Sequence, residues 1–504
     1  GTCAGNAFSV DVTVNPTPVI ANVTEIICSS GTFTVTPANG TDVVPSNTTY
    51  TWSAPAAITG ITGLTAGTNE STINGTLVNT TNAAIDVVYT VTPVSGTCTG
   101  STFTVTVTVD PVPNIANTTD IICSGEMFTV TPVDGTDNVP FGTTYSWSAP
   151  SVAGITGTLA GSNESNISNT LENTTNAPID VTYSVTPIAN GCSGQAFDIV
   201  VTVNPTPVVA DVTETICSSG SFTVAPTNGT DIVPSNTTYS WTAPTAVGIT
   251  GLAAGTNETA ITGTLVNTTN AAITVTYTVT LESALGCAGA SFDVNVTVEP
   301  TPAIADETVE ACTNSAFSVT PANGGANNNI VPAGTVYSWS APAAVTGITN
   351  LASGTNETDF NGNLVNTTSA PIDVTYTVTP MAGQCMGATF YVVVTVNPTS
   401  VIANQVVAAC TGDNFTVAPV DGNNGDVVPT TTVYSWSAPA AVTGITGLAA
   451  GTNETDFNGN LVNTTNAPIV VTYSVTPSNG TCAGNAFSVD VTVNPTPVIA
   501  NVTE

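Results

Sequence analysis

The chain has 504 residues, of which 34 are Asp or Glu and none is Lys, Arg or His, so its formal net charge is −34. It therefore lacks the cations that neutralise phosphates in nucleic-acid binding, a histidine general base, and an amine nucleophile. Its charge also repels anionic membrane surfaces. No apolar run approaches the ~18 residues of a spanning helix, so we expect no membrane insertion and no nucleic-acid partner.

The sequence is one unit repeated five times. Its opening segment, 1–25, recurs without change at 480–504, which suggests a piece of a longer array. We place boundaries at the prolines that end each alternating run. This gives the end of a preceding repeat (1–15), five repeats (16–110, 111–204, 205–299, 300–397 and 398–494) and the start of a following one (495–504). A single Trp marks each repeat: Trp52, Trp147, Trp241, Trp339 and Trp436.

Each repeat is predicted to be a β-sandwich. Apolar and polar residues alternate with the period of a half-buried strand, and Asn-Gly, Pro-Ser-Asn and Asn-Thr-Thr clusters separate the runs. In the first repeat the predicted strands are 32–37, 49–53, 72–77, 85–93 and 103–109, with weaker ones near Val19 and Ile26. About seven short strands in ~96 residues are typical of a sandwich. The fold class is therefore all-β, a tandem array of five sandwiches.

Two cysteines recur in every repeat, and each is followed five residues later by Phe. There is no C-x-x-C motif and no histidine to complete a zinc site, and no cation is present to stabilise a thiolate. The even number per repeat instead predicts structural disulfides and an oxidising compartment. The predicted disulfide cysteines are Cys28, Cys98, Cys123, Cys192, Cys217, Cys287, Cys312, Cys385, Cys410 and Cys482.

Two pairings of these cysteines are compatible with the sequence. Pairing within repeats is favoured because each sandwich then has its own cross-link, and closing a ~70-residue loop stabilises by about 4 kcal/mol in the chain-entropy model. It gives Cys28–Cys98, Cys123–Cys192, Cys217–Cys287, Cys312–Cys385 and Cys410–Cys482, with Cys3 bonded to a residue before the segment. The alternative crosses the linkers, as in Cys3–Cys28, and leaves Cys482 for a partner beyond the segment.

The Trp residues have two interpretations. One Trp per repeat could form a platform for stacking sugars, or it could fill the core of the sandwich. The core interpretation is favoured because a Tyr lies two positions earlier each time and so shares its face of the strand. These tyrosines are Tyr50, Tyr145, Tyr239, Tyr337 and Tyr434.

The carboxylates raise the questions of calcium and of catalysis. A Glu follows GTN or GSN in every repeat, at Glu70, Glu164, Glu258, Glu357 and Glu454, and an Asn, Asp or Glu precedes each linker proline. Oxygen atoms are calcium ligands, but no D-x-D-x-D-G pattern occurs and the ligands fall short of six to eight. Calcium is thus the one candidate cofactor, and we expect that the protein requires no cofactor.

The carboxylates also raise the question of catalysis. Glycoside hydrolysis needs only paired carboxylates, yet few acidic positions recur in every repeat, so we expect no enzyme activity.

The motifs YTWS, YTVTP and FTVTVTVDPVP, in this order and with the cysteines, resemble the PKD-like and immunoglobulin-like repeats of giant surface proteins from Bacteroidetes. The gliding-motility adhesins exported by type IX secretion are the most similar. The resemblance covers all five repeats and implies an exported protein of the bacterial cell surface. One departure concerns the cysteines. Cys98 lies nine residues after Tyr89, whereas the second Cys of antibody domains lies two residues after the corresponding Tyr.

These observations predict the shaft of a long extracellular adhesin that projects a distal binding region and serves in gliding motility or attachment. Its expected partners are the neighbouring repeats, and surface glycans or substrata through regions outside this segment. Short proline-containing joints limit bending, and uniform charge opposes association between exposed strand edges. The alternative is a multivalent carbohydrate-binding array. Buried aromatic side chains would favour the shaft, and exposed clusters of them the binding array.

Overall fold

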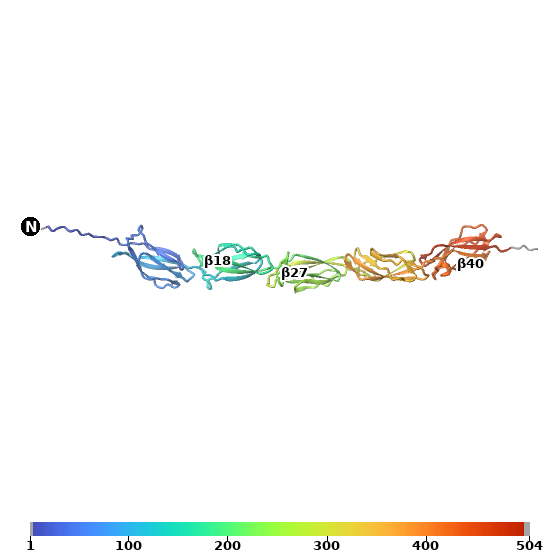
Figure 1. Ribbon diagram of the computed structural model, residues 1–504, viewed down its shortest axis with the longest axis horizontal. Coiled ribbons are helices and arrows are strands. Elements are labelled where there is room, and N and C mark those ends of the chain that lie inside the picture. The colour runs from blue at the N-terminus through green and yellow to red at the C-terminus, as the bar shows by residue number, and fades with distance from the viewer. Residues whose placement is uncertain (1–3, 498–504) are drawn as a thin grey trace, which may run out of the picture.

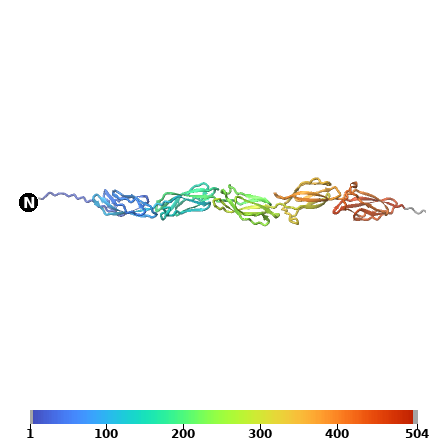
Figure 2. The same cartoon turned by 90° about the horizontal axis from the view of Figure 1, so that it is seen from below.

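The computed structural model describes residues 4–497 and consists of five β-sandwiches arranged in single file (Figures 1 and 2). The predicted all-β tandem array is confirmed. Within the described residues the one helical element is the short 3-10 turn η1 (Asn423–Gly425). No helix in this part of the chain is long and apolar enough to cross a membrane.

Each unit has a main sheet and a smaller facing layer. In the first unit the main sheet contains β1 (Val23–Cys28), β3 (Thr48–Trp52), β5 (Gly67–Glu70), β8 (Ile85–Ser95), β9 (Cys98–Thr99) and β10 (Phe103–Asp110). The facing layer pairs β2 (Thr32–Val35) with β6 (Ile73–Thr76), and β4 (Ile61–Thr62) with β7 (Val78–Asn79).

The second and third units repeat this plan. The second contains β11 (Thr118–Cys123), β12 (Met127–Val130), β13 (Thr144–Trp147), β14 (Ile155–Thr156), β15 (Gly161–Glu164), β16 (Ile167–Thr170), β17 (Glu172–Asn173), β18 (Ile179–Ala189), β19 (Cys192–Ser193) and β20 (Phe197–Asn204). The third contains β21 (Val212–Cys217), β22 (Gly220–Val224), β23 (Thr238–Trp241), β24 (Ile249–Thr250), β25 (Gly255–Glu258), β26 (Ile261–Asn267), β27 (Ile273–Glu282) and β28 (Phe292–Glu299).

The fourth and fifth units follow in the same order. The fourth contains β29 (Glu307–Cys312), β30 (Ala316–Val319), β31 (Val336–Trp339), β32 (Ile348–Thr349), β33 (Gly354–Glu357), β34 (Phe360–Asn363), β35 (Val365–Asn366), β36 (Ile372–Ala382), β37 (Cys385–Met386) and β38 (Phe390–Asn397). The fifth contains β39 (Gln405–Cys410), β40 (Asn414–Val417), β41 (Thr432–Trp436), β42 (Ile445–Thr446), β43 (Gly451–Glu454), β44 (Phe457–Asn460), β45 (Val462–Asn463), β46 (Ile469–Asn479), β47 (Cys482–Ala483) and β48 (Phe487–Asn494).

The first and last strands of each unit run parallel, and this fixes the direction of the unit. In the first unit the main-sheet order is β1-β10-β8-β3-β5, and only β1 and β10 pair in parallel. Val23 lies opposite Val105 and Cys28 opposite Asp110. Both strands therefore run from the leading end of the unit, where the chain comes in, to the trailing end, where it leaves.

The core lies between the two layers and follows from the alternation in the sequence. Val105, Val107 and Val109 of β10 are fully buried, while the threonines between them are only partly covered. Burying one such side chain contributes about 1.5–3 kcal/mol. Trp52 packs against Gly67 of the neighbouring strand, where a Cβ atom would lie 2.3 Å from the indole ring. The same Gly–Trp contact recurs in all five units.

A buried asparagine joins the facing layer to the last strand of each unit. In the third unit, Asn267 is only 2% exposed. Its Nδ2 donates to the carbonyl oxygens of Ala271 at 2.7 Å and Val298 at 2.8 Å. Its Oδ1 accepts from the backbone N–H and the hydroxyl of Thr269. The equivalents, Asn79, Asn173, Asn366 and Asn463, make the same bonds.

All five strands predicted with a defined range in the first unit are present, and the weaker one near Ile26 is β1. Val19 forms only an isolated bridge to Val43. The sequence prediction does not include the short strands β4, β7 and β9. It also lacks β5, because Gly and Asn in the GTNE segment are residues typical of turns. In the structure this segment is a bulged edge strand, with Asn69 at φ 62° and Glu70 opposite Tyr50. A left-handed Asn is compatible with a bulge as well as with a turn.

Ten tyrosine side chains are buried in the cores of the units, each at most 3% exposed. Burial raises the pKa of each above its ordinary value of 10, and for Tyr434 burial, followed by the charges of Asp426 and Asp456, raises it to about 12. The other nine are Tyr50, Tyr89, Tyr145, Tyr183, Tyr239, Tyr277, Tyr337, Tyr376 and Tyr473. The folded chain thus retains these phenolic protons at pH values where the unfolded chain releases them.

We expect stability to be flat from about pH 5.5 to 8, where neither carboxylates nor tyrosines titrate. It should fall steeply as pH rises from 10 towards 12, because the contribution of a raised pKa is complete below the unfolded value and is lost as pH passes through the folded value. Denaturant unfolding followed by Trp fluorescence measures this dependence. A transition near pH 6.5 would contradict the expectation, because the chain contains no histidine.

Candidate functional site

Residues 4–497 contain four disulfides, and each joins two neighbouring units. The bonds are Cys28–Cys192, Cys123–Cys287, Cys217–Cys385 and Cys312–Cys482. In every case the first cysteine of one unit, here called the early cysteine, pairs with the second cysteine of the next unit, called the late cysteine. Cys28 and Cys192 are an example. The Cα–Cα distances are 5.5–5.6 Å, within the range of unstrained disulfides.

The expected pairing within units, such as Cys28–Cys98, is therefore wrong, and the topology gives the reason. Cys28 ends β1 at the trailing end of the first unit, opposite Asp110. Cys98 lies in the β8–β9 hairpin at the leading end, before β10 begins at Phe103. The eight residues of β10 separate the two ends by roughly 26 Å at 3.3 Å per residue. Bonded cysteines need Cα atoms within about 7 Å.

The alternative pairing across a linker is also wrong. Cys98 lies at the leading end of the first unit, whereas Cys123 ends β11 at the trailing end of the second, opposite Asn204. Neither Cys98 nor Cys410 has a disulfide partner within the described residues. Cys3, for which we expected a partner before the segment, lies outside the described residues.

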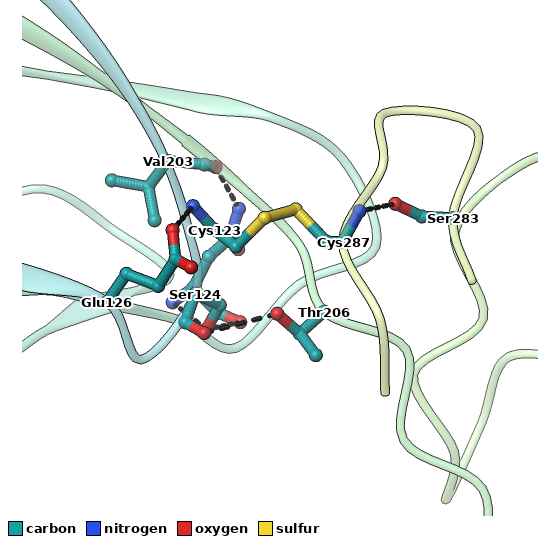
Figure 3. The surroundings of a disulfide bond; sticks show 8 residues. Cys123, Ser124, Glu126, Val203, Thr206, Ser283 and Cys287 are labelled. Atoms are coloured by element: carbon teal, nitrogen blue, oxygen red, sulfur yellow. Dashed lines mark hydrogen bonds between the residues drawn. A yellow bond between two sulfur atoms is a disulfide. The ribbon is translucent and has the colours of Figure 1, made fainter. Parts of the chain in front are cut away.

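The joint around Cys123–Cys287 shows how the two cysteines are held (Figure 3). The backbone N–H of Cys123 donates to the carboxylate of Glu126 at 2.9 Å, and that of Cys287 to the Ser283 hydroxyl at 3.2 Å. From the linker, the Thr206 hydroxyl donates to the carbonyl oxygen of Ser124 at 3.1 Å. The bond thus lies among ordered contacts from both units and the linker.

The loop that carries the late cysteine packs on the linker in front of its own unit. In the third unit a Cβ atom on Gly289 would lie 2.1 Å from the carbonyl oxygen of Pro207, so only glycine fits at this distance. The same close approach occurs in every unit, at Gly100, Gly194, Gly289, Gly387 and Gly484. This contact places the late cysteine at the leading end, next to the trailing end of the preceding unit.

Polar contacts reinforce two of the joints. Asn82 of the first unit donates to Asp134 of the second, and Ser369 of the fourth donates to Asp421 of the fifth at 2.7 Å. The Ser369 hydroxyl, followed by the backbone N–H of Val428, holds the pKa of Asp421 below its ordinary value. These are exposed interactions, and they add orientation more than stability.

The Trp residues lie in the core. Trp52 is 5% exposed and the other four 8%, and the Trp52 indole N–H donates to the carbonyl oxygen of Thr65 at 3.1 Å. The tyrosines two positions earlier are at most 2% exposed. The interpretation of the Trp as core is therefore correct, and neither ring of the pair offers a stacking face to a sugar.

The candidate calcium residues do not form a cluster. Glu70 and its four equivalents are exposed on the bulged edge strands. The residues before the linker prolines lie at the trailing ends, where the Asp110 and Asn204 backbone carbonyls accept hydrogen bonds from Ser29 and Ser124. No group of three or more acidic or cysteine side chains within residues 4–497 has a geometry suited to a metal ion.

A groove of about 690 Å³ lies at the joint between the third and fourth units, beside the Cys217–Cys385 disulfide. Its walls are largely small and apolar, including Ala271, Ala272 and Pro300, with Glu299 as the acidic side chain. One carboxylate without a positioned base or nucleophile does not form a catalytic arrangement. The recurring chemical feature of this protein is thus the cross-linked joint.

These observations define a tandem array of β-sandwich domains that are covalently joined to their neighbours. The chain belongs to the PKD-like domain family, whose model matches residues 25–113, 120–207, 214–302, 309–400 and 407–497. A search of curated proteins found no similar sequence.

Several solved multidomain structures are similar to this chain, at low sequence identity and low TM-score. Immunoglobulin domains 1–5 of Sidekick-1 match with 10% identity and a TM-score of 0.23, covering 94% of this chain and 98% of that one. The human desmocollin-1 ectodomain matches with 9% identity and a TM-score of 0.22, at 94% and 98% coverage. The titin I-band fragment I67–I69 matches with 11% identity and a TM-score of 0.28, at 58% and 97% coverage.

Proposed function

We propose that this protein is the shaft of a long extracellular surface adhesin, which holds a distal binding region away from the cell. The single-file arrangement with a disulfide at every joint carries the proposal (Figure 1). Disulfides of this kind persist in oxidising compartments, which supports an extracellular location. The resemblance of the repeats to Bacteroidetes surface proteins supports a bacterial cell surface and a role in attachment or gliding motility.

The uniform charge suits this function. With 34 acidic residues and no basic one, shafts repel each other wherever they approach within the Debye length of ~8 Å at physiological salt. This repulsion opposes pairing between the edge strands of neighbouring shafts. The partners of each repeat are then its neighbours in the same chain. Glycans or substrata would be bound by the distal region that the shaft projects.

In a longer array, Cys98 and Cys410 would each be bonded to a further repeat. Cys98 has the position of Cys192, which is bonded to the preceding unit, and Cys410 that of Cys312, which is bonded to the following unit. We therefore propose that all ten predicted cysteines form disulfides in such an array, with the unit boundaries at residues 110, 204, 299, 397 and 494.

A carbohydrate-binding array is the second candidate. It requires aromatic faces that are open to solvent, but the Trp and Tyr repeated in every unit are buried. Within the five units the exposed aromatic side chains are Phe141 and Tyr391, and neither recurs at the equivalent position of another unit. The shaft is therefore the better-supported function.

The shape of the oxidised protein in solution tests the shaft. A ~96-residue sandwich is roughly 40 Å long, so five in line span about 200 Å. Electron microscopy and small-angle scattering should give a rod of this length and of one domain's width. A chelator should change the length little, whereas marked softening would reveal calcium at the joints. A compact particle, with units packed side by side, would overturn the proposal.

A further inference from the structure

Backbone and disulfides together form a continuous covalent path that bypasses most of each unit. It crosses from Cys28 to Cys192 through a disulfide and follows the backbone to Cys217. It then crosses to Cys385 and follows the backbone again to Cys410. The body of each unit, such as the stretch from Cys28 to Cys98, lies outside this path.

The backbone segments of this path are already extended in the folded protein. Between Cys192 and Cys217 the chain runs through β19, β20, the linker and β21, with no turn and no residue at positive φ. It starts at the leading end of the second unit and ends at the trailing end of the third, where Cys217 lies opposite Glu299. A segment of about 25 residues spans at most about 80–90 Å, close to the length of two sandwiches.

A second path of the same kind accompanies the first. It runs from Cys98 to Cys123, crosses to Cys287, continues to Cys312, and crosses to Cys482. Its segment from Cys287 to Cys312 is likewise free of turns and of residues at positive φ. Each interior unit is therefore traversed by both paths, once in its first strand and once in its last.

We propose that the disulfides make the array a covalent tape of fixed length, which carries tension without unfolding its domains. The proposal rests on the shaft function and adds how the shaft responds to load. A pulling force lowers the free energy of the unfolded state by the force multiplied by the length that unfolding releases. Because the path is extended before any unit unfolds, unfolding releases almost none. Without the disulfides, each unit of ~96 residues would release roughly 300 Å at 3.3–3.6 Å per residue.

Single-molecule stretching of the whole chain tests this proposal, with click handles on non-natural amino acids at the exposed positions Thr24 and Asp413. In the oxidised protein the shortest covalent path between the handles has about 57 residues, so extension should stop at about 200 Å. After reduction the entire backbone between the handles bears the load. The limit should then rise about sevenfold, to roughly 1,300 Å, with stepwise unfolding.

Cutting one disulfide gives a sharper test without a reducing agent. In the double variant Cys217→Ser, Cys385→Ser, the shortest path must use the second set of disulfides. This detour has about 167 residues, so the limit should rise about threefold, to roughly 580 Å. The variant Cys98→Ser is the matched control, because this cysteine lies outside the path between the handles, and its limit should equal that of the parent.

The outcomes separate the tape from the shaft. Oxidised protein that extends well beyond the length of its shortest covalent path, or a double variant that stops where the parent does, would overturn the tape. Electron microscopy of the same samples reports rod shape independently and confirms that each variant is folded. Rods that stretch in the oxidised state would refute the tape and leave the shaft standing, whereas compact particles would refute the shaft itself.

Discussion

The substitution Asn267→Asp is expected to lower the stability of the third unit by about 3 kcal/mol or more. The amide Nδ2 donates to two carbonyl oxygens at 2.7 and 2.8 Å. A carboxylate oxygen in its place has no proton to donate to either carbonyl oxygen and would be repelled by both. Water cannot compensate, because the Asn267 side chain is only 2% exposed. Differential scanning calorimetry should show a separate transition for one unit at lower temperature.

The exposed Asn270, three residues further along the same turn, provides the matched control. Asn270→Asp makes the same chemical change in water and should shift stability by no more than about 0.5 kcal/mol. The Asn267→Asp defect should also shrink on acidification. The buried carboxyl has a raised pKa in the folded state, so its protonated form is favoured there, and stability is regained as pH falls through that value. Equal effects of the two substitutions would show that the buried hydrogen bonds do not stabilise the unit.

Removing one disulfide is expected to turn a stiff joint into a hinge. In the double variant Cys123→Ser, Cys287→Ser, the second and third units lose a bond that closes a 164-residue loop, worth about 5 kcal/mol in the chain-entropy model. Both sandwiches should remain folded, because the core of each unit lies between its own main sheet and facing layer and does not include the disulfide. Electron microscopy should show a wide spread of angles at this joint and unchanged angles at the others.

Cys98→Ser is again the control, since this cysteine is unbonded within the described residues. Peptide mapping without reduction checks the connectivity directly, with cleavage at Asp and Glu because the chain offers trypsin no site. Cys123 should be recovered with Cys287. Recovery with Cys192 would restore the pairing within units, and a double variant as straight as the parent would show that packing alone holds the joint.

The sequence was sufficient to predict much of the fold. The alternation in FTVTVTVD predicts β10 with the right face buried, and the Tyr–Trp spacing of two predicts that both rings enter the core. The bulged edge strand β5 is not predicted, because an Asn that adopts positive φ, as Asn69 does, is as typical of a turn as of a bulge. The buried role of Asn79 was missed for a related reason. Asn-Thr-Thr is typical of an exposed turn, and only packing brings Val109 O within reach of its amide.

By itself the sequence determined the all-β class, the five repeats, the absence of any cation and the presence of two cysteines per repeat. These properties depend on composition and on short-range periodicity, which a single chain displays directly. Only the tertiary structure decided which cysteines meet. The parallel pairing of β1 with β10 puts Cys28 at the trailing end of its unit, and the β8–β9 hairpin puts Cys98 at the leading end. Connectivity depends on the distance between strand ends in space, and sequence spacing does not encode that distance.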